Sequence, residues 1–171
     1  MTSTHQDFTP PPAPGLEYAL TVALELDHEL GAVRTRQMSS GLAYGFIGVR
    51  GGWFQGPRIR GRAIAGGGDW PTIRGDNVAH FDASYILVAD DGTNIRLHNR
   101  GLRVDPDLHV DGEPFVPGVA RKFSEPEGIY FRTTPLFDVE AGPHDWLAKR
   151  AFVGLGERRA SGNMIHYYAV Q

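Results

Sequence analysis

The side chains best suited to catalysis or ligand binding are concentrated in the block Gly51–Gly101. The block contains Asp69, Trp70, His80, Asp82, Tyr85, Arg96, His98 and Asn99. A carboxylate can take a proton from a substrate, an imidazole can relay one, and a phenol can donate a hydrogen bond to a developing oxyanion. This density of ionisable and aromatic groups predicts a ligand pocket, although it does not identify the ligand.

Asp69 follows three glycines, Gly66, Gly67 and Gly68, at a corner where the backbone can approach a ligand closely. One interpretation makes Asp69 a general acid/base or an anchor for a substrate hydroxyl. In the other, the carboxylate closes the turn through nearby backbone amides, while Trp70 plugs the end of the fold. Both interpretations stay open from the residues alone.

Asp82 lies in an alternating run, Val78–Ala89, and shares one face of that strand with His80 and Ser84. Residues two apart on a strand lie roughly 6.5–7 Å apart, so a ligand can bridge them. If this face points inward, Asp82 is a candidate base with a pKa raised by burial. If the apolar face carrying Tyr85 points inward, Asp82 belongs to a solvated outer face. The sequence leaves this choice open.

A second candidate set combines Tyr130 and Arg132, which share one face of a later strand, with Tyr85. The phenol and the guanidinium could stabilise an enolate oxygen or bind a carboxylate. The alternative for Arg132 is a structural ion pair with one of the acidic side chains. We therefore predict Asp69, Asp82, Tyr130 and Arg132 as catalytic residues.

Aromatic residues of the same block predict an apolar cavity with a few polar anchors, as small-molecule sites usually have. The predicted substrate-binding residues are Trp53, Phe54, Trp70, Tyr85 and Asn99.

Several kinds of site are disfavoured by the motifs. The chain has no cysteine, which excludes thiolate catalysis and disulfides. His80, His98 and His166 could converge as metal ligands, but no short metal-binding spacing supports this. The glycine clusters match neither a phosphate-binding loop nor a dinucleotide fingerprint, and no serine lies in a nucleophile elbow. We expect no metal and no cofactor.

The composition suits one ordinary globular domain. The chain has 171 residues, 41% of them hydrophobic and 22% charged, with a formal net charge of −3. Arginine greatly outnumbers lysine, since Lys122 and Lys149 are the two lysines. A net negative charge does not indicate a nucleic-acid-binding protein. We also expect no membrane span and no signal peptide, and hence a cytoplasmic protein.

Strand-like alternation recurs along most of the chain. The expected strands are Leu16–Leu26, Ala43–Val49, Ile59–Ala65, Val78–Ala89, Asn94–Asn99, Ile129–Thr134, Ala148–Leu155 and Asn163–Val170. The turn Asp90-Asp91-Gly92 predicts a hairpin. His144–Lys149 could form one helical turn. Residues 1–15 are proline-rich and predict a flexible tail, which leaves 16–171 as the domain.

Two further features concern the surroundings of a cavity. Asp105–Gly128 is too long for an ordinary hairpin loop, and such loops are usually functional lids or disordered. At least seven strands at hairpin spacing predict an antiparallel sandwich or barrel. Because several strands are apolar on both faces, one of those faces must be covered, and we expect a homodimer.

The series GGWFQGPRIRG, GGGDW and FDASYILVADDGTNIRLHNRG resembles the DUF3237 family, also called UPF0311. The later segments GIYFRTTPLFD, DWL and FVGLGERR are similar to the family's second half. The resemblance covers residues 16–171 and implies a small lipocalin-like or avidin-like antiparallel β-barrel. It implies no particular activity, because the family is uncharacterised.

Three functional hypotheses follow. The first is a cofactor-free acid/base enzyme, of isomerase, cyclase or lyase type, acting on a small hydrophobic oxygenated metabolite inside the barrel. The second is a non-catalytic protein of the same fold that binds such a molecule. The third is a barrel filled by its own side chains that acts only through its oligomer surface.

Overall fold

The computed structural model describes residues 9–104, 129–159 and 161–171, and these form one antiparallel sheet with a single short helix. The strands are β1 (Leu16–Arg34), β2 (Ala43–Gln55), β3 (Arg60–Ala63), β4 (Gly68–Asp69), β5 (Thr72–Ile73), β6 (Val78–Ala89), β7 (Asn94–Val104), β8 (Tyr130–Val139), β9 (Phe152–Arg158) and β10 (Gly162–Val170). The 3₁₀-helix η1 (Asp145–Lys149) lies between β8 and β9.

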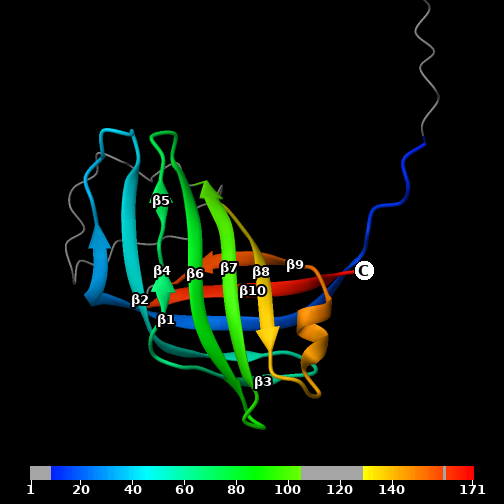
Figure 1. Cartoon of the computed structure of the whole chain (residues 1–171). Coiled ribbons are helices and arrows are strands. Elements are labelled where there is room, and N and C mark those ends of the chain that lie inside the picture. The colour runs from blue at the N-terminus through cyan, green and yellow to red at the C-terminus, as the bar shows by residue number, and fades with distance from the viewer. Residues whose placement is uncertain (1–8, 105–128, 160) are drawn as a thin grey trace, which may run out of the picture.

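The sheet closes into a barrel because β1 pairs with both β10 and β2 (Figure 1). Each long strand pairs with its neighbours in the chain, as in an up-and-down barrel. The three short strands β3, β4 and β5 each pair with both β2 and β6. They therefore share one position in the barrel wall, so ten strands fill eight positions. The predicted all-β barrel is confirmed.

The hairpin β6–β7 provides the longest regular part of the wall. Its pairing continues from Val78–Val104 to Val88–Asn94, and the turn uses Gly92 at a φ of 91°. On β6 the residues at odd positions from Ala79 to Ala89 are the more buried ones. The apolar face of this strand is thus the inner face, and the face of His80, Asp82 and Ser84 is the outer one.

Several predicted boundaries differ from the structure. β1 continues to Arg34, because after a register shift its last residues pair again with β2. The expected strand Leu16–Leu26 is therefore too short at its C-terminal end. The expected helical turn is present as η1, and this helix delays the start of β9 to Phe152. β4 and β5, each two residues long, carried no alternation that could have predicted them.

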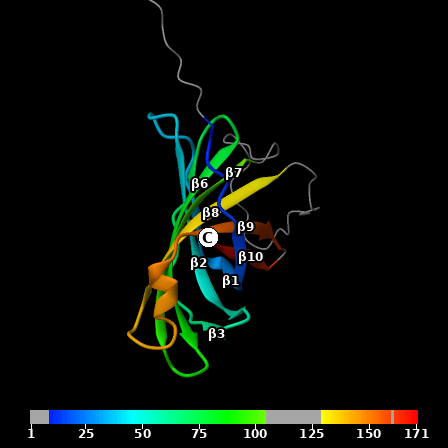
Figure 2. The same ribbon diagram turned by 90° about the vertical axis from the view of Figure 1, so that its right-hand side faces the viewer.

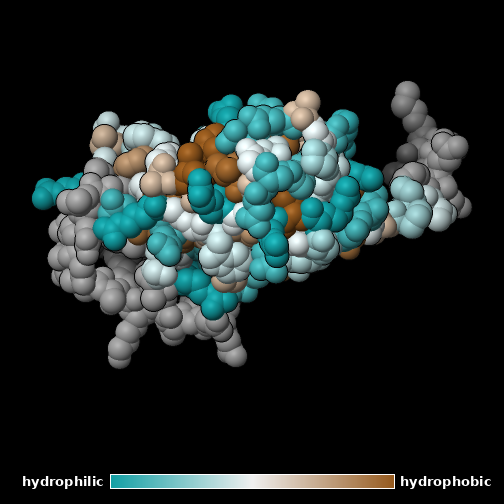
Figure 3. Space-filling model, turned by 90° about the horizontal axis from the view of Figure 1, so that it is seen from below, coloured by the Kyte–Doolittle hydropathy of each residue, from teal (hydrophilic) through white to brown (hydrophobic). Residues whose placement is uncertain are grey.

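The hydrophobic core consists of a large cluster, which includes residues from the end of the β6–β7 hairpin at the bottom of Figure 1, and a small cluster of Ala43, Ile73 and Ala79 with Phe81 packed against it. Its largest fully buried side chains are Tyr167, Phe54, Leu20, Leu87, Ile95, Leu97, Leu147 and Val22. η1 lies at this end of the barrel and contributes Leu147 (Figure 2). Seen from below, hydrophobic residues gather near the middle of the molecule, with hydrophilic residues around them (Figure 3). Tyr85 and Tyr167 belong to the large cluster and bring hydroxyl groups into the interior.

Two predicted segments fall wholly or partly outside the described residues. The long segment Asp105–Gly128, which connects β7 to β8, lies outside them. Of the proline-rich tail, residues 9–15 are described; they are exposed and have no regular structure. The tail and the domain limits stay predictions.

The glycine corner before β4 generates a test of the fold. Gly67 has a φ of +72°, and a Cβ there would lie 2.3 Å from the backbone oxygen of Ser84. We expect Gly67→Ala to lower the free energy of unfolding by on the order of 3 kcal/mol, since it adds both backbone strain and a backbone clash. Urea denaturation measures the change. Gly75→Ala is the control, because a Cβ at Gly75 meets nothing within 4 Å. Equal stability of the two variants would contradict the close approach.

Candidate functional site

The upper part of the barrel interior contains a group of polar side chains, which we call the interior polar cluster. It consists of Asp69, Tyr85, Asn99, Arg103, Thr133, Arg158 and Tyr167. The register creates one part of it, because Asp69 on β4 lies opposite Ala83 on β6, and Ala83 lies opposite Asn99 on β7. Paired residues of neighbouring strands share a face of the sheet. Because Ala83 is buried, the side chains of Asp69 and Asn99 also point into the barrel.

Asp69 is the acidic member of this cluster. Its residue is 8% exposed, and its Oδ1 accepts a hydrogen bond of 3.1 Å from the backbone amide of Asp82. Burial raises the pKa of Asp69 from 3.8 to about 7, although the Asp82 amide and the positive charge of Arg158 oppose the shift. Near neutral pH, Asp69 is therefore present in both its acid and its base form. A group in this state can accept and return protons at physiological pH.

Tyr85 and Tyr167 supply two buried phenols, and Tyr85 lies within electrostatic range of Asp69. Burial raises the pKa of both hydroxyls well above the usual value, so both stay protonated. The two hydroxyls lie close enough to shift each other's pKa, but their geometry is not that of a normal hydrogen bond. Gly154 makes room here, since a Cβ there would lie 2.2 Å from Thr133 Oγ1. The phenols can act as hydrogen-bond donors to a ligand oxygen.

Arg103 and Arg158 bring positive charge to the cluster. Arg158 is on the same face of β9 as Phe152 and Gly154, and its Nη1 donates a 2.8 Å hydrogen bond to Asn163 Oδ1. Burial and the neighbouring charge of Arg103 lower the pKa of Arg158 to about 10, while Asp69 opposes this shift. Arg158 thus lies within electrostatic range of both Arg103 and Asp69, and with a pKa of about 10 it remains charged at neutral pH.

The structure brings together three of the predicted site residues: Asp69, Tyr85 and Asn99. The Asn99 Oδ1 atom is buried and has no hydrogen-bond partner among the described residues. Phe54 also faces inward and is 1% exposed, but it belongs to the packed lower core.

The other predicted residues do not join this cluster. Asp82 is on the outer face of β6, where its Oδ1 lies 2.5 Å from His98 Nε2 and its Oδ2 lies 3.3 Å from Arg100 Nη2. The hydrogen bond from His98 and the charge of Arg100 outweigh desolvation and lower the pKa of Asp82. Of the two faces left open for Asp82 by the sequence, the structure shows the solvated outer one, because the apolar face of β6 is the buried one.

Tyr130 and Arg132 also lie on the outside of the barrel. Tyr130 is 49% exposed, and the Arg132 guanidinium lies over its ring at 4.8 Å from the centroid. Arg132 Nη1 also donates to the backbone oxygen of Phe131 at 2.9 Å. Their alternation with the buried Phe131 and Thr133 places them outward. The structure therefore does not unite them with Asp69.

Trp53 and Trp70 are exposed as well, at 47% and 62%. Trp70 follows the inward Asp69 and so points outward, where its ring packs on Phe46 at 4.4 Å between centroids. Together with Tyr130 and Leu136, which is 70% exposed, these residues leave apolar area on the outer surface. The homodimer stays a prediction.

Sequence reasoning missed four members of the interior polar cluster: Arg103, Thr133, Arg158 and Tyr167. Continuing two alternations would have found the arginines. On β7, Arg103 lies on the same strand face as the buried Ile95, Leu97 and Asn99. On β9, Arg158 lies on the same face as Phe152, Gly154 and Gly156. Both arginines lie near strand ends, beyond the limits that the apolar pattern indicated.

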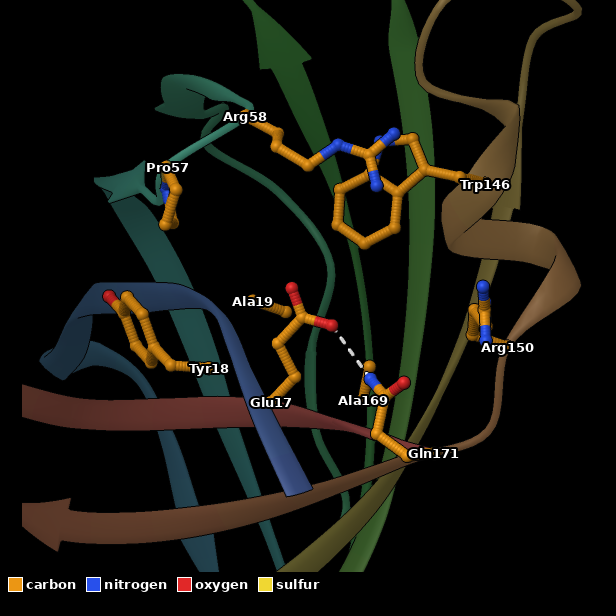
Figure 4. Close-up of a pocket in the computed structure, with 9 residues that line it drawn as sticks. All are labelled: Glu17, Tyr18, Ala19, Pro57, Arg58, Trp146, Arg150, Ala169 and Gln171. Carbon is orange, nitrogen blue, oxygen red and sulfur yellow. Dashed lines mark hydrogen bonds between the residues drawn. The ribbon is translucent and has the colours of Figure 1, made fainter. Parts of the chain in front are cut away.

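Pockets open at two other places among the described residues. One, of about 390 Å³, includes Trp70, His80, Asp82 and Arg100 in its lining. The other, of about 150 Å³, lies beside η1, where Arg58 covers the ring of Trp146 at 4.3 Å and Glu17 accepts a hydrogen bond from Gln171 (Figure 4). The second pocket contains none of the predicted site residues.

The histidines considered as metal ligands do not converge in the described part of the chain. No group of three His, Asp or Glu side chains suited to a metal ion occurs among the described residues. His166 instead bonds to Thr21 Oγ1 through Nδ1 at 2.8 Å and faces Glu157 through Nε2 at 3.1 Å. A search of the described residues for a helix long and apolar enough to span a membrane finds none.

Comparison with known proteins places this barrel in a family. Residues 14–170 match the model described as "Protein of unknown function (DUF3237)". The chain belongs to the DUF3237 family. A UPF0311 protein of Clostridium acetobutylicum is 27% identical over 72% of this chain and 75% of the relative. A UPF0311 protein of Rhodopseudomonas palustris is 31% identical over 72% of this chain and 78% of the relative.

Solved structures share the fold of this DUF3237 member. A conserved protein of unknown function from Rhodopseudomonas palustris has a TM-score of 0.76 at 26% identity, covering 94% of this chain and 100% of the other. A β-barrel-like protein from Acinetobacter baumannii has a TM-score of 0.77 at 24% identity, covering 96% and 100%. A structure described as an enzyme from Penicillium herquei has a TM-score of 0.68 at 20% identity, covering 96% and 99%.

The raised pKa of Asp69 generates a prediction about stability. The folded protein holds this proton more tightly than the unfolded chain does, because the pKa rises from 3.8 to about 7. The contribution of Asp69 to the free energy of unfolding is therefore greatest at low pH, falls as the pH rises from about 4 to about 7, and then stays constant.

Asp69→Asn removes the carboxyl that titrates, so the stability of the variant relative to the wild type should increase between pH 4 and pH 8. The expected gain is on the order of 2–4 kcal/mol. Urea denaturation at several pH values measures it. The exposed Asp138, changed to Asn, serves as the control with a much smaller pH-dependent difference. A stability difference for Asp69→Asn that does not change with pH would contradict the buried titration.

Proposed function

We propose that this protein is a cofactor-independent acid/base enzyme that moves a proton on a small, hydrophobic, oxygenated molecule in the upper barrel interior. The observation that carries the proposal is Asp69, a carboxyl that is 8% exposed, has a pKa of about 7, and lies among hydrogen-bond donors and positive charge. Perturbed carboxyls of this kind are concentrated at functional sites. The reaction class is isomerisation, cyclisation or lyase chemistry.

The proposed step is proton abstraction next to a carbonyl. The Asp69 carboxylate takes a proton from the carbon beside the carbonyl, the C–H electron pair forms a C=C bond, and the carbonyl oxygen becomes an enolate oxygen. The protonated Asp69 returns the proton to the same or another atom of the substrate. Atoms and charge balance within the substrate and Asp69, so the step needs no further reactant.

The developing oxyanion requires stabilisation from groups that are already oriented. Arg158 lies within electrostatic range of Asp69, and the Tyr85 hydroxyl is protonated and also coupled to Asp69. These two groups therefore take the role first predicted for Tyr130 and Arg132. The packed lower core limits access of water from that end and strengthens the electrostatic interactions above it.

The same interior also suits a binding protein that leaves its ligand unchanged. Asn99 Oδ1 is buried without a hydrogen-bond partner among the described residues, and a ligand donor could satisfy it. The barrel of the Penicillium herquei enzyme is similar in fold, but at 20% identity the likeness extends to the fold alone. An experiment is therefore needed to distinguish an enzyme from a binding protein.

Hydrogen–deuterium exchange at carbon tests the proposal. The protein is incubated in D₂O with small aromatic ketones and 1,3-diketones, and proton NMR follows the loss of the signal beside the carbonyl. We expect catalysed exchange that decreases at least 100-fold in Asp69→Asn, because general base catalysis contributes about 10²–10⁴-fold. The rate should rise with pH to a plateau, with a midpoint near 7, as Asp69 ionises.

Asp82→Asn is the matched control, since it makes the same chemical change on the outer face of the wall. We expect it to retain most of the exchange activity. Binding of these compounds without catalysed exchange would instead support the binding protein. Loss of exchange in Asp82→Asn but not in Asp69→Asn would overturn the proposal and move the site to the outer pocket.

A further inference from the structure

The pocket beside η1 is separate from the interior polar cluster, because the two share no residue. It lies where four parts of the chain meet: β1, the turn between β2 and β3, η1, and the end of β10 (Figure 4). Its volume is about 150 Å³, and the buried Ala19 and Ala169 close it on the side of the core. It is therefore a second candidate site, independent of Asp69.

The turn between β2 and β3 holds Arg58 over this pocket. The Gly56 amide donates a 2.7 Å hydrogen bond to the backbone oxygen of Ile59, which closes the turn. A Cβ at Gly56 would lie 2.0 Å from the backbone oxygen of Ala19, so the turn packs directly on β1. The Arg58 guanidinium lies over the Trp146 ring at 4.3 Å from its centroid. This stacking orients Arg58 and leaves its N–H edges available to a carboxylate.

The side chains of β1 that line the pocket are also fixed. The Tyr18 hydroxyl lies 2.8 Å from Thr21 Oγ1 in a hydrogen bond, and its ring packs edge-on against Tyr168 with centroids 5.7 Å apart. Glu17 Oε2 accepts a 2.7 Å hydrogen bond from Gln171 Nε2. Side chains that are oriented before a ligand arrives reduce the entropy lost on binding.

Charges of both signs line this pocket without pairing with one another. In the part of the chain that the structure describes, no ion pair joins Glu17 to Arg58 or to Arg150. The second carboxylate oxygen of Glu17 points into the space beneath Arg58 (Figure 4). A ligand that carries a positive and a negative group close together is complementary to this arrangement.

The remaining walls favour a compact apolar group between these charges. Tyr18, Pro57 and Trp146 contribute rings to the lining. A cavity of about 150 Å³ is large enough for a benzene molecule. The pocket therefore suits a ligand that combines two opposite charges with a side chain of about that size.

We propose that this pocket binds an α-amino acid with an apolar side chain of about the size of a phenyl ring. The carboxylate of the amino acid bonds to Arg58 and Arg150, and its ammonium group bonds to Glu17. Its side chain lies against Tyr18 and Trp146. The two charged groups of such a ligand share one carbon atom, which suits opposite charges on neighbouring walls. The site is distinct from that of the proposed function and does not depend on it.

Three probes with the same ring test this inference. L-Phenylalanine carries both charged groups, 3-phenylpropanoate lacks the ammonium group, and 2-phenylethylamine lacks the carboxylate. Isothermal titration calorimetry measures the affinities, and the indole N–H signal of Trp146 in a proton–nitrogen correlation spectrum reports occupation of this pocket. We expect the wild type to bind phenylalanine at least about 10-fold more tightly than either other probe, since each charged hydrogen bond contributes that much.

The charged residues should affect the probes selectively. Arg58→Gln should reduce the affinity for phenylalanine and 3-phenylpropanoate about 10-fold and change that for 2-phenylethylamine little. Glu17→Gln should reduce the affinity for phenylalanine and 2-phenylethylamine but not for 3-phenylpropanoate. A merely structural role would change all three affinities together. Arg60→Gln is the control, because Arg60 lies next to the turn but pairs with Asp90 at 2.8 Å.

Circular dichroism melts verify folding of the variants. If Arg58→Gln does not fold, Arg150→Gln and the comparison of the three probes on the wild type decide the question. Absence of phenylalanine binding, or equal affinity for the three probes, overturns the proposal. Binding that leaves the Trp146 signal unchanged also overturns it, since the ligand then occupies another site. A loss in Arg60→Gln as large as in Arg58→Gln overturns the assignment of Arg58.

Discussion

One position of the barrel wall is built from three short strands, and the location of Asp69 depends on this interruption. β3, β4 and β5 follow one another between β2 and β6, separated by the glycine corner and by Trp70 and Pro71. A continuous strand would bind its neighbours entirely through its own backbone groups. At the interruption the amide of Asp82 bonds to the Asp69 side chain instead. The carboxyl thereby becomes part of the wall, and its position is set by the sheet rather than by a mobile loop.

The interior of this small barrel combines a packed hydrophobic core with the interior polar cluster. Large side chains such as Phe54, Leu87 and Tyr167 fill the lower half and supply most of the buried apolar area. Tyr167 connects the halves, because it packs on Phe137 while its hydroxyl faces the polar side.

Local sequence patterns predicted the strands well where alternation was long, as in Val78–Ala89, which the structure reproduces residue for residue. For Asp82 they left two possibilities, a side chain pointing into the barrel or out of it. The structure shows that the apolar face of the strand is the inner one, so Asp82 points outward. They could not show which residues meet across strands, because register depends on distant pairings. Asp69 was identified from its glycine corner, whereas Arg158 was missed because glycines at 154 and 156 interrupt the hydrophobic pattern of β9. Those same glycines create the space beside Thr133 and Phe131.

The hydrogen bond between the Asp82 amide and Asp69 has a consequence for how such a protein can diverge. The wall here is one strand thick, so Asp69 and the ion cluster of Asp82, His98 and Arg100 lie on opposite sides of the same short stretch of backbone. The negative charge of Asp82 contributes to raising the pKa of Asp69 although the two side chains never share a space. Substitutions on the solvent side can therefore shift the pKa of the enclosed Asp69 carboxyl without changing the residues around it. Relatives that keep the same interior residues can thus diverge in the charge of that interior through changes on the outer face alone.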